Sequence, residues 1–268
     1  MDSINFNLYW KVINEVTGYD FSGHNPELIM RRLESFVSQE KIGSADELRE
    51  RLFTDRFSKE NILGNLLVNF TEFFRDPLFF HSLRKVILPL LATNTRISIW
   101  HAGCSTGEEV YSLAILLEEL NLLDRCQIIA TDKNEQNIKV AVSGIFPINR
   151  AREANYRYFR AGGTRHLSKH YTAYYDHIIF DEKLRDKIKF INHDMILSKP
   201  TSRFHLVLCR NVFVYFNYVL QQKALATISN SMYNYGYFAM GAQEQLVNLE
   251  RHNFVSVNNE NKIFRKII

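Results

Sequence analysis

Helical periodicity runs through the first quarter of the chain. One helical face is formed by apolar residues at positions i, i+4, i+7 and i+8, namely Ile29, Leu33, Phe36 and Val37. Ser44 with Glu47 three positions later has the form of a capping box and predicts the start of the next helix. The pattern continues over 61–70 and shows no strand signal, so residues 1–68 are predicted to be helical.

Strands and helices alternate from about residue 95 onward. Short apolar runs are predicted as strands at 97–103, 127–132, 187–192, 204–209 and 235–241, with helices at 106–120, 134–142 and 219–232 and a terminal hairpin over 254–257 and 262–266. This alternation predicts a parallel sheet wrapped by helices.

One segment interrupts the alternation. Residues 146–186 are longer than a simple crossover requires, and residues 145–189 hold ten Lys and Arg against five Asp and Glu. We interpret the segment as an inserted subdomain on the sheet edge with a small β-element. Tyr171, Tyr174 and Tyr175 are expected to form its core, a peptide-binding edge being the alternative.

Composition narrows the class of protein. The 268 residues are 46% hydrophobic and 23% charged with a net charge of +4, as in a folded protein without the strong basicity of a nucleic-acid binder. No apolar stretch approaches 18 residues, no signal-peptide pattern precedes the fold, and three scattered cysteines form no framework, so a cytoplasmic protein is expected. His166, His170 and His177 are expected to be surface histidines rather than metal ligands.

A glycine-containing turn joins the first predicted strand to the next helix. It reads His101-Ala-Gly-Cys-Ser-Thr-Gly-Glu-Glu-Val-Tyr-Ser, where open α/β sheets bind nucleotide-like ligands. Gly103 would permit a tight turn and Gly107 close packing of the helix. Asp132 ends the second predicted strand, where a carboxylate can accept hydrogen bonds from both ribose hydroxyls. A structural turn beside a solvated aspartate is the alternative.

The residues around the glycines argue against a dinucleotide. The spacing is G-x-x-x-G rather than G-x-G-x-x-G, and Glu108 and Glu109 follow at once. Acidic residues in the first turn of a helix suit its dipole but repel a pyrophosphate. They suit a cationic ligand such as S-adenosylmethionine (SAM), which carries a sulfonium and an ammonium and has no phosphate.

Four elements resemble the CheR family, the SAM-dependent methyltransferases of chemotaxis-receptor glutamates. In chain order they are Asn69-Phe-Thr-Glu-Phe-Phe-Arg-Asp, Ala102-Gly-Cys-Ser-Thr-Gly-Glu-Glu-Val-Tyr-Ser, Ala130-Thr-Asp and Cys209-Arg-Asn-Val-Phe-Val-Tyr-Phe. The resemblance covers residues 1–268. It implies an α/β fold: an all-helical receptor-recognition domain at 1–68, then a Rossmann-like methyltransferase domain at 69–268 with an inserted small β-subdomain at about 146–186.

The resemblance also implies the residues of the site. Those that would surround SAM, and its product S-adenosylhomocysteine (SAH), are Asn69, Thr71, Arg75, Ala102, Gly103, Cys104, Glu108, Asp132, Asp194, Met195, Cys209 and Arg210. Arg75 and Tyr215 would face the methyl group and are the predicted catalytic residues. No metal is implied, and Cys104 and Cys209 are expected to be buried beside the cofactor rather than to act as redox sensors.

A glutamate acceptor fits this chemistry. Its side chain is ionised at neutral pH, so methyl transfer needs in-line placement and removal of water rather than a general base. Arg75 would hold the carboxylate by a charge-assisted bond and Tyr215 would orient its other oxygen. The expected function is formation of γ-glutamyl methyl esters on a methyl-accepting chemoreceptor or similar coiled-coil signalling protein. A monomer is expected that neither binds nucleic acid nor inserts into a membrane.

Two features depart from the family pattern. Gly241-Ala-Gln-Glu stands where Gly-His-Ser-Glu is typical, and residues 1–68 hold eight Lys and Arg against eleven Asp and Glu instead of a basic docking face. The basic insertion is therefore the expected docking surface for acidic receptor helices, with plain solvated surfaces as the alternative. One alternative is a catalytically weak signalling module that binds SAM or SAH. Another is a methyltransferase with a different acceptor. The modest net charge disfavours RNA as that acceptor, and the family-like helical domain disfavours a small molecule.

Overall fold

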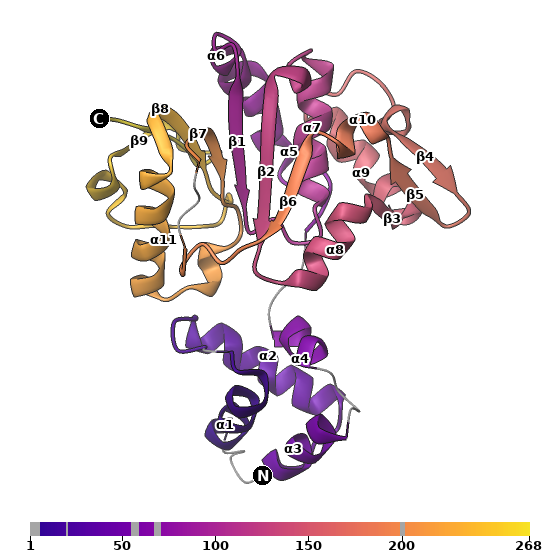
Figure 1. The fold of residues 1–268 in the computed structure, drawn as a ribbon, viewed down its shortest axis with the longest axis vertical. Coiled ribbons are helices and arrows are strands. Elements are labelled where there is room, and N and C mark those ends of the chain that lie inside the picture. The colour runs from indigo at the N-terminus through magenta and orange to yellow at the C-terminus, as the bar shows by residue number, and fades with distance from the viewer. Residues whose placement is uncertain (1–5, 20, 55–58, 67–70, 199–201) are drawn as a thin grey trace. The chain divides into compact units, whose positions relative to one another are not determined.

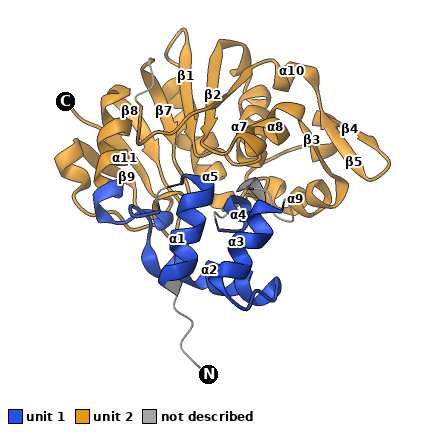
Figure 2. Cartoon of the chain, turned by 60° about the horizontal axis from the view of Figure 1, so that its bottom comes forward, with its two compact units in different colours: residues 1–69, 214–221 blue, residues 70–213, 222–268 orange. Residues whose placement is uncertain are grey.

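Two compact units make up the chain. The computed structural model describes residues 6–19, 21–54, 59–66, 71–198 and 202–268. Unit 1 consists of residues 1–69 and 214–221, and unit 2 of residues 70–213 and 222–268 (Figure 2). The second segment of unit 1 lies far from the first in the sequence, which the hydrophobic pattern did not predict.

Unit 1 is helical, as expected. Its N-terminal helices are α1 (Phe6–Thr17), α2 (Pro26–Gln39), α3 (Ala45–Phe53) and α4 (Lys59–Leu66). The predicted apolar face of α2 is buried in their common core. Ser44 caps α3 by accepting from the Glu47 N–H at 3.1 Å, while Glu47 Oε2 accepts from the Gly43 N–H at 2.7 Å. The capping box therefore closes one residue earlier than the sequence predicts.

Backbone hydrogen bonds attach residues 214–221 to the loop before α2. The Asn25 N–H donates to the Tyr215 carbonyl at 2.8 Å, and the Asn217 N–H donates to the Gly23 carbonyl at 2.9 Å. A Cβ on Gly23 would lie 2.3 Å from Leu220 Cδ1, so the absence of a side chain there permits this close approach. Unit 1 thus combines the N-terminal helices with a distant segment that holds the end of η4 (Phe213–Tyr215) and the first turn of α11 (Tyr218–Asn230).

Unit 2 is built on a mixed seven-stranded sheet. In spatial order its strands are β6 (Ile188–Asn192), β2 (Cys126–Asp132), β1 (Ile97–Ala102), β7 (Phe204–Leu208), β8 (Met232–Ala239), β10 (Ile263–Lys266) and β9 (Phe254–Asn258). The first five run parallel and the last two pair antiparallel, which confirms the predicted parallel sheet and terminal hairpin (Figure 1). The chain steps to opposite sides of β1 when it enters β2 and β7. Sheets with such a reversal bind ligands at the carboxyl ends of the strands that flank it, here β1 and β7.

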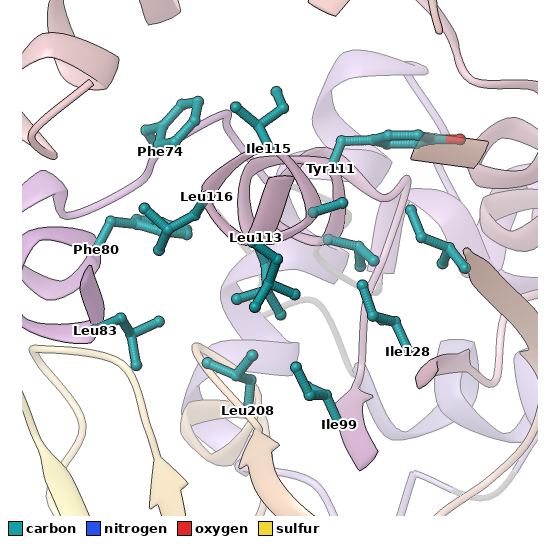
Figure 3. Close-up of a cluster of buried hydrophobic side chains, with 14 of the residues drawn as sticks. Phe74, Phe80, Leu83, Ile99, Tyr111, Leu113, Ile115, Leu116, Ile128 and Leu208 are labelled. Atoms are coloured by element: carbon teal, nitrogen blue, oxygen red, sulfur yellow. The ribbon is translucent and has the colours of Figure 1, made fainter. Parts of the chain in front are cut away.

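Helices cover the sheet and connect its strands. In chain order they are α5 (Pro77–Ser82), η1 (Leu83–Ile87), α6 (Leu88–Leu91), α7 (Glu108–Glu119), η2 (Leu123–Arg125), α8 (Glu135–Ser143), α9 (Ile148–Arg160), η3 (Leu167–His170), α10 (Glu182–Arg185), η4 (Phe213–Tyr215), α11 (Tyr218–Asn230) and η5 (Leu249–His252). Helix α7 is almost entirely buried: Leu113 faces the sheet residues Ile99 and Leu208, and Leu116 points toward Phe80 of α5 (Figure 3). No helix in the described ranges has both the length and the apolar character needed to cross a bilayer.

The insertion holds a three-stranded sheet and a long helix. Strands β3 (Ile145–Pro147), β5 (His177–Phe180) and β4 (Tyr171–Tyr174) form the sheet in that order, with α9 between β3 and η3. The expected tyrosine core is wrong for two residues: Tyr174 is exposed and Tyr175 fully so, because Phe146 and Phe180 fill the core instead. His170 is buried rather than on the surface, since Glu118 and Glu119 lie against its ring.

Candidate active site

The turn between β1 and α7 is shaped by its glycines. Gly103 has φ +72°, and a Cβ there would lie 2.5 Å from Val212 Cγ2, so a larger residue would be strained and would clash. Gly107 has φ +96° and starts α7 against Ala141. The N–H groups of Gly103 and Cys104 both donate to the Thr131 carbonyl, at 2.8 and 2.9 Å. The turn is therefore fixed to the carboxyl end of β2.

Asp132 connects the turn to α8. Its Oδ2 accepts from the Ser105 N–H at 2.8 Å, and its Oδ1 accepts from the Asn134 N–H at 2.8 Å and the Asn137 amide at 3.4 Å. Burial raises the pKa of Asp132, and these hydrogen bonds oppose the rise. Oδ2 accepts one hydrogen bond from the protein and retains a lone pair, and the acid is held at the position where a ribose-binding acid is predicted.

Glu108 is a fully buried carboxylate at the start of α7. Its Oε2 accepts from Thr106 Oγ1 at 2.6 Å, and its Oε1 contacts the guanidinium of Arg150 from α9. Burial raises the pKa of Glu108, while Thr106, the backbone and Arg150 favour the ionised form. The side chain thus offers negative charge beside the glycine turn.

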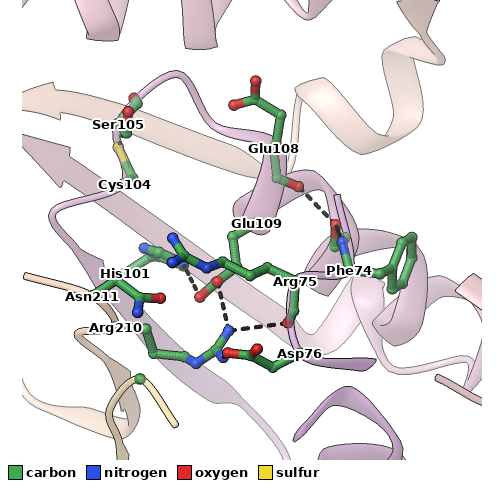
Figure 4. A network of polar contacts seen from close by, with 12 residues as sticks. Phe74, Arg75, Asp76, His101, Cys104, Ser105, Glu108, Glu109, Arg210 and Asn211 are labelled. Carbon is green, nitrogen blue, oxygen red and sulfur yellow. Dashed lines mark hydrogen bonds and ion pairs between the residues drawn. The ribbon is translucent and has the colours of Figure 1, made fainter. Parts of the chain in front are cut away.

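A second ion-pair network lies beneath the turn. Arg210 donates to Glu109 Oε2 and to Asp76 Oδ2, both at 2.6 Å, and the Nε2 atom of His101 lies 3.1 Å from Glu109 Oε1 (Figure 4). Burial opposes ionisation of Glu109, but Arg210, His101 and Arg75 together lower its pKa. The network joins three segments far apart in the sequence.

Arg75 lies over this network. Figure 4 shows its side chain reaching across Glu109 toward His101. Its neighbours Phe74 and Asp76 both have positive φ, +53° and +54°, and the Phe74 N–H donates to Ser112 Oγ at 2.9 Å. This strained backbone, fastened on both sides, aims a cationic side chain at the glycine turn.

Glu244 supports the loop that follows β7. Its carboxylate is buried and accepts from the N–H groups of Asn211, Phe213 and Gly241 at 2.9, 2.8 and 2.6 Å. A Cβ on Gly241 would lie 2.6 Å from Asn211 Nδ2, so this glycine leaves room for that amide. In Gly241-Ala-Gln-Glu, the two ends that match the family pattern are therefore the ones that shape the loop.

Comparison with known proteins identifies the family. The family model "CheR methyltransferase, SAM binding domain" matches residues 69–263, and "CheR methyltransferase, all-alpha domain" matches residues 4–71. The chain belongs to the CheR methyltransferase family. It is therefore a SAM-dependent methyltransferase, and the predicted family, fold class and cofactor are confirmed.

Several CheR relatives match over almost their whole length. A protein of Pseudomonas putida named putative methyltransferase Cher3 is 38% identical over 249 residues, which is 92% of this chain and 91% of that protein. A chemotaxis protein methyltransferase of Listeria innocua is 26% identical and covers 94% of each chain. Chemotaxis protein methyltransferase 1 of Pseudomonas aeruginosa is 28% identical and covers 92% of each.

Six of the thirteen residues predicted for the CheR site lie around the glycine turn. Ala102, Gly103, Cys104 and Glu108 belong to the turn or its flanks, Asp132 faces it, and Arg75 reaches toward it. Burial raises the pKa of the Cys104 and Cys209 thiols, which favours the expected unreactive packing role.

The other predicted residues differ in their surroundings. Asn69 lies outside the described residues, and Thr71 is half-buried at the beginning of the described part of unit 2. Asp194 accepts from the Ile196 N–H at 2.7 Å and Met195 is buried after β6. Arg210 uses its guanidinium in the buried network, and Tyr215 belongs to unit 1.

The polar atoms around the turn fit SAM. Ser105 Oγ and Asn211 Oδ1 are buried without a hydrogen-bond partner among the residues that the structure describes. Together with the carboxylates of Asp132 and Glu108, they offer acceptors for hydroxyl and ammonium groups. Within the same residues, no three His, Cys, Asp or Glu side chains are grouped to hold a metal ion.

The sequence analysis gave no site role to Asp76, Arg150 or Asn211, and it expected Glu109 to suit a cationic ligand as Glu108 does, whereas the structure pairs Glu109 with Arg210. Each depends on a partner more than 30 positions away, so local spacing gave no sign of the pairing. The doublet Glu108–Glu109 was the one local signal. The structure separates its members, since Glu108 faces α9 while Glu109 is enclosed with Arg210.

Proposed function

We propose that this CheR methyltransferase acts in chemotaxis and methylates glutamate carboxylates of a chemoreceptor or related signalling protein. The carrying observation is the placement of Arg75, a cation aimed at the glycine turn beside two carboxylates that suit SAM. The names of relatives from Listeria and Pseudomonas as chemotaxis protein methyltransferases support the pathway. The product would be a γ-glutamyl methyl ester.

Each residue has a role in this proposal. Asp132 would accept from the ribose hydroxyls, and Glu108 would face the ammonium of the amino-acid group. Bound SAM supplies an electrophilic methyl group: an acceptor carboxylate oxygen forms the new O–C bond while the C–S bond breaks and sulfur keeps the electron pair. Arg75 would hold the acceptor carboxylate in line, and Tyr215 would donate its hydroxyl to the other oxygen.

The insertion is the proposed docking surface. On α9 and the loop after it, Tyr156 is 69% exposed, Phe159 is 43% exposed, and Arg160 and Arg165 are exposed beside them. A mixed cationic and aromatic surface suits an acidic helix. Residues 1–68 carry more acidic than basic side chains, so they attract an acidic partner less strongly than the insertion does.

Methyl transfer from SAM labelled in the methyl group tests the acceptor. Purified enzyme is incubated with membranes of the source cell, and labelled protein is treated with alkali, which releases methanol from carboxyl esters. Base-labile label mapped to glutamate by mass spectrometry is expected, and Arg75→Met is expected to lose at least about 100-fold in kcat/KM. Base-stable label would contradict the glutamate assignment, whereas SAH binding without label would favour the SAM-binding signalling module.

The docking surface has its own test. Arg160→Glu is expected to raise the KM for the acceptor about fivefold while leaving kcat and the Kd for SAH unchanged, because rim charges act mainly on encounter. Lys223→Glu, an exposed charge reversal on α11, is the matched control. Equal effects of the two substitutions would remove the insertion from the docking surface.

A further inference from the structure

Arg150 and Glu108 form an unequal ion pair. The side chain of Glu108 has no exposed surface, whereas that of Arg150 is 49% exposed. Glu108 is fixed in the first turn of α7, where its backbone carbonyl accepts from Ser112 Oγ at 2.7 Å. Arg150 reaches the carboxylate from α9, an element of the insertion. The carboxylate is therefore enclosed by the protein, and its cation comes from the surface.

Arg150 can leave this pair at low cost. Its guanidinium is already half hydrated, so water can replace what the carboxylate supplies. Glu108, in contrast, has no exposed surface: one oxygen accepts from Thr106 Oγ1, and the buried charge still needs a cation or a proton. A ligand ammonium that approaches Glu108 from the glycine turn meets an oxygen already in contact with Arg150, and two cations at one carboxylate oxygen repel each other.

We propose that Arg150 is a displaceable counter-ion of Glu108, which the ammonium of the cofactor replaces when SAM or SAH binds. The released guanidinium then turns to the exposed face of α9. This inference rests on the assignment of the cofactor ammonium to Glu108 made above. In the free enzyme Arg150 favours the ionised form of the buried carboxylate, and its return to Glu108 favours product release.

Calorimetric titration with SAH at pH 8 tests the competition. Arg150→Met removes the competitor, so SAH is expected to bind about five- to tenfold more tightly. Arg152→Met, which removes another exposed arginine of α9, is expected to leave the Kd within twofold. The pH is kept at 8 because Glu108 in the Arg150→Met variant lacks its cation and takes up a proton more readily as the pH falls.

A ligand without the ammonium provides the matched control. 5′-Methylthioadenosine keeps the adenosine and the sulfur but lacks the amino-acid group. Its affinity, measured by displacement of SAH, is expected to be the same in the wild type and in Arg150→Met. Tighter binding of both ligands by the variant would mean that the arginine affects the whole pocket, and would contradict the proposed competition.

Arginine labelling follows the release in the unaltered protein. Phenylglyoxal modifies accessible guanidinium groups, and peptide mass spectrometry gives the rate at each arginine. SAH is expected to raise the rate at Arg150 at least about twofold and to leave the rate at Arg152 unchanged, because the guanidinium loses its carboxylate partner. Unchanged or slower labelling of Arg150 would overturn the proposal, even if the substituted protein proved unstable.

Glu108→Gln separates this inference from the assignment on which it rests. If SAH binds this variant as tightly as the wild type, the ammonium does not lie at Glu108 and the proposed cofactor arrangement is wrong. If Glu108→Gln weakens binding but Arg150→Met does not strengthen it, the arrangement stands and the competition is wrong. In the double variant, the effect of Arg150→Met is expected to disappear.

Discussion

Glu244 is the residue on which the loop after β7 depends. Its carboxylate accepts three backbone N–H groups, and no protonated or amide side chain can do the same at that geometry. The loop carries Asn211, whose amide oxygen has no hydrogen-bond partner in the part of the chain that the structure describes and belongs to the candidate site. A single buried carboxylate therefore shapes part of the candidate site.

Replacing Glu244 by Gln is expected to lower the free energy of unfolding by about 2–3 kcal/mol, because an NH₂ group would face backbone N–H donors. Urea denaturation at pH 7 measures the change. Glu250→Gln, an exposed carboxylate nearby, is the control and is expected to stay within about 0.5 kcal/mol of the wild type. Similar values for the two variants would contradict the anchoring role.

Glu109 predicts a pH dependence of stability. Its folded-state pKa is lowered, so its ionisation stabilises the fold above the unfolded carboxyl pKa of about 4.3 and ceases to do so as the pH falls below it. Glu109→Gln leaves Arg210 buried with one partner fewer and is expected to cost about 3–5 kcal/mol at pH 7. The difference between wild type and variant, measured by urea denaturation, is expected to shrink as the pH falls from 5 to 3. A difference that did not change with pH would mean that ionisation of Glu109 is not its cause.

At the scale of elements, the insertion shares one core with the sheet. Phe180 of β5 stacks on Tyr111 of α7 with ring centroids 4.6 Å apart and contacts Phe73 and Phe146 edge-on. The insertion therefore contributes to the stability of unit 2 rather than folding as a separate body.

Phe180→Ala is expected to cost about 3–5 kcal/mol, since it opens a cavity between three aromatic rings. Tyr175→Ala, at a fully exposed position of the same subdomain, is expected to change stability by less than about 0.5 kcal/mol. Thermal unfolding followed by circular dichroism distinguishes them. A separate low-temperature transition in Phe180→Ala would show that the insertion unfolds independently.

Local patterns predicted the central strands and many of the helices because the spacing of apolar residues reflects the face that each element buries. The runs at β1, β2, β6 and β7 and the capped helices were recognised from apolar spacing and turn residues alone. Helix α9 was hidden in the insertion, where tyrosines and arginines obscure its narrow buried face. The burial of His170 and the Arg210 network could not be predicted, because both are fixed by partners brought close only by folding.

At the scale of the whole molecule, helix α11 links the two units through a continuous backbone. Its first four residues belong to unit 1 and the remainder to unit 2. Asn217 precedes the helix: its Oδ1 accepts from the Leu220 N–H at 3.0 Å, and its Nδ2 donates to the Ser22 carbonyl at 3.2 Å. One side chain therefore both caps α11 and ties it to the N-terminal loop.

Asn217→Ala is expected to lower the free energy of unfolding by about 1–2 kcal/mol through loss of the cap. The two tryptophans report on different units, Trp10 in α1 and Trp100 in β1. Asn217→Ala is introduced into Trp10→Phe, where Trp100 reports, and into Trp100→Phe, where Trp10 reports. The midpoint of unfolding followed by fluorescence is expected to shift equally in the two proteins, because α11 belongs to both units. A shift seen through Trp10 alone would mean that the units unfold separately.

The discontinuity of unit 1 constrains how new specificities can arise in such chains. A recombination event that exchanged only residues 1–69 between two homologues would pair a foreign loop before α2 with a resident 214–221 segment. The contacts of Gly23 and Asn25 with that segment would then join residues that had never been selected together. To avoid this mismatch, a chimaera would need two further crossovers, one on each side of residues 214–221. The helical unit therefore evolves by gradual substitution more readily than by wholesale exchange.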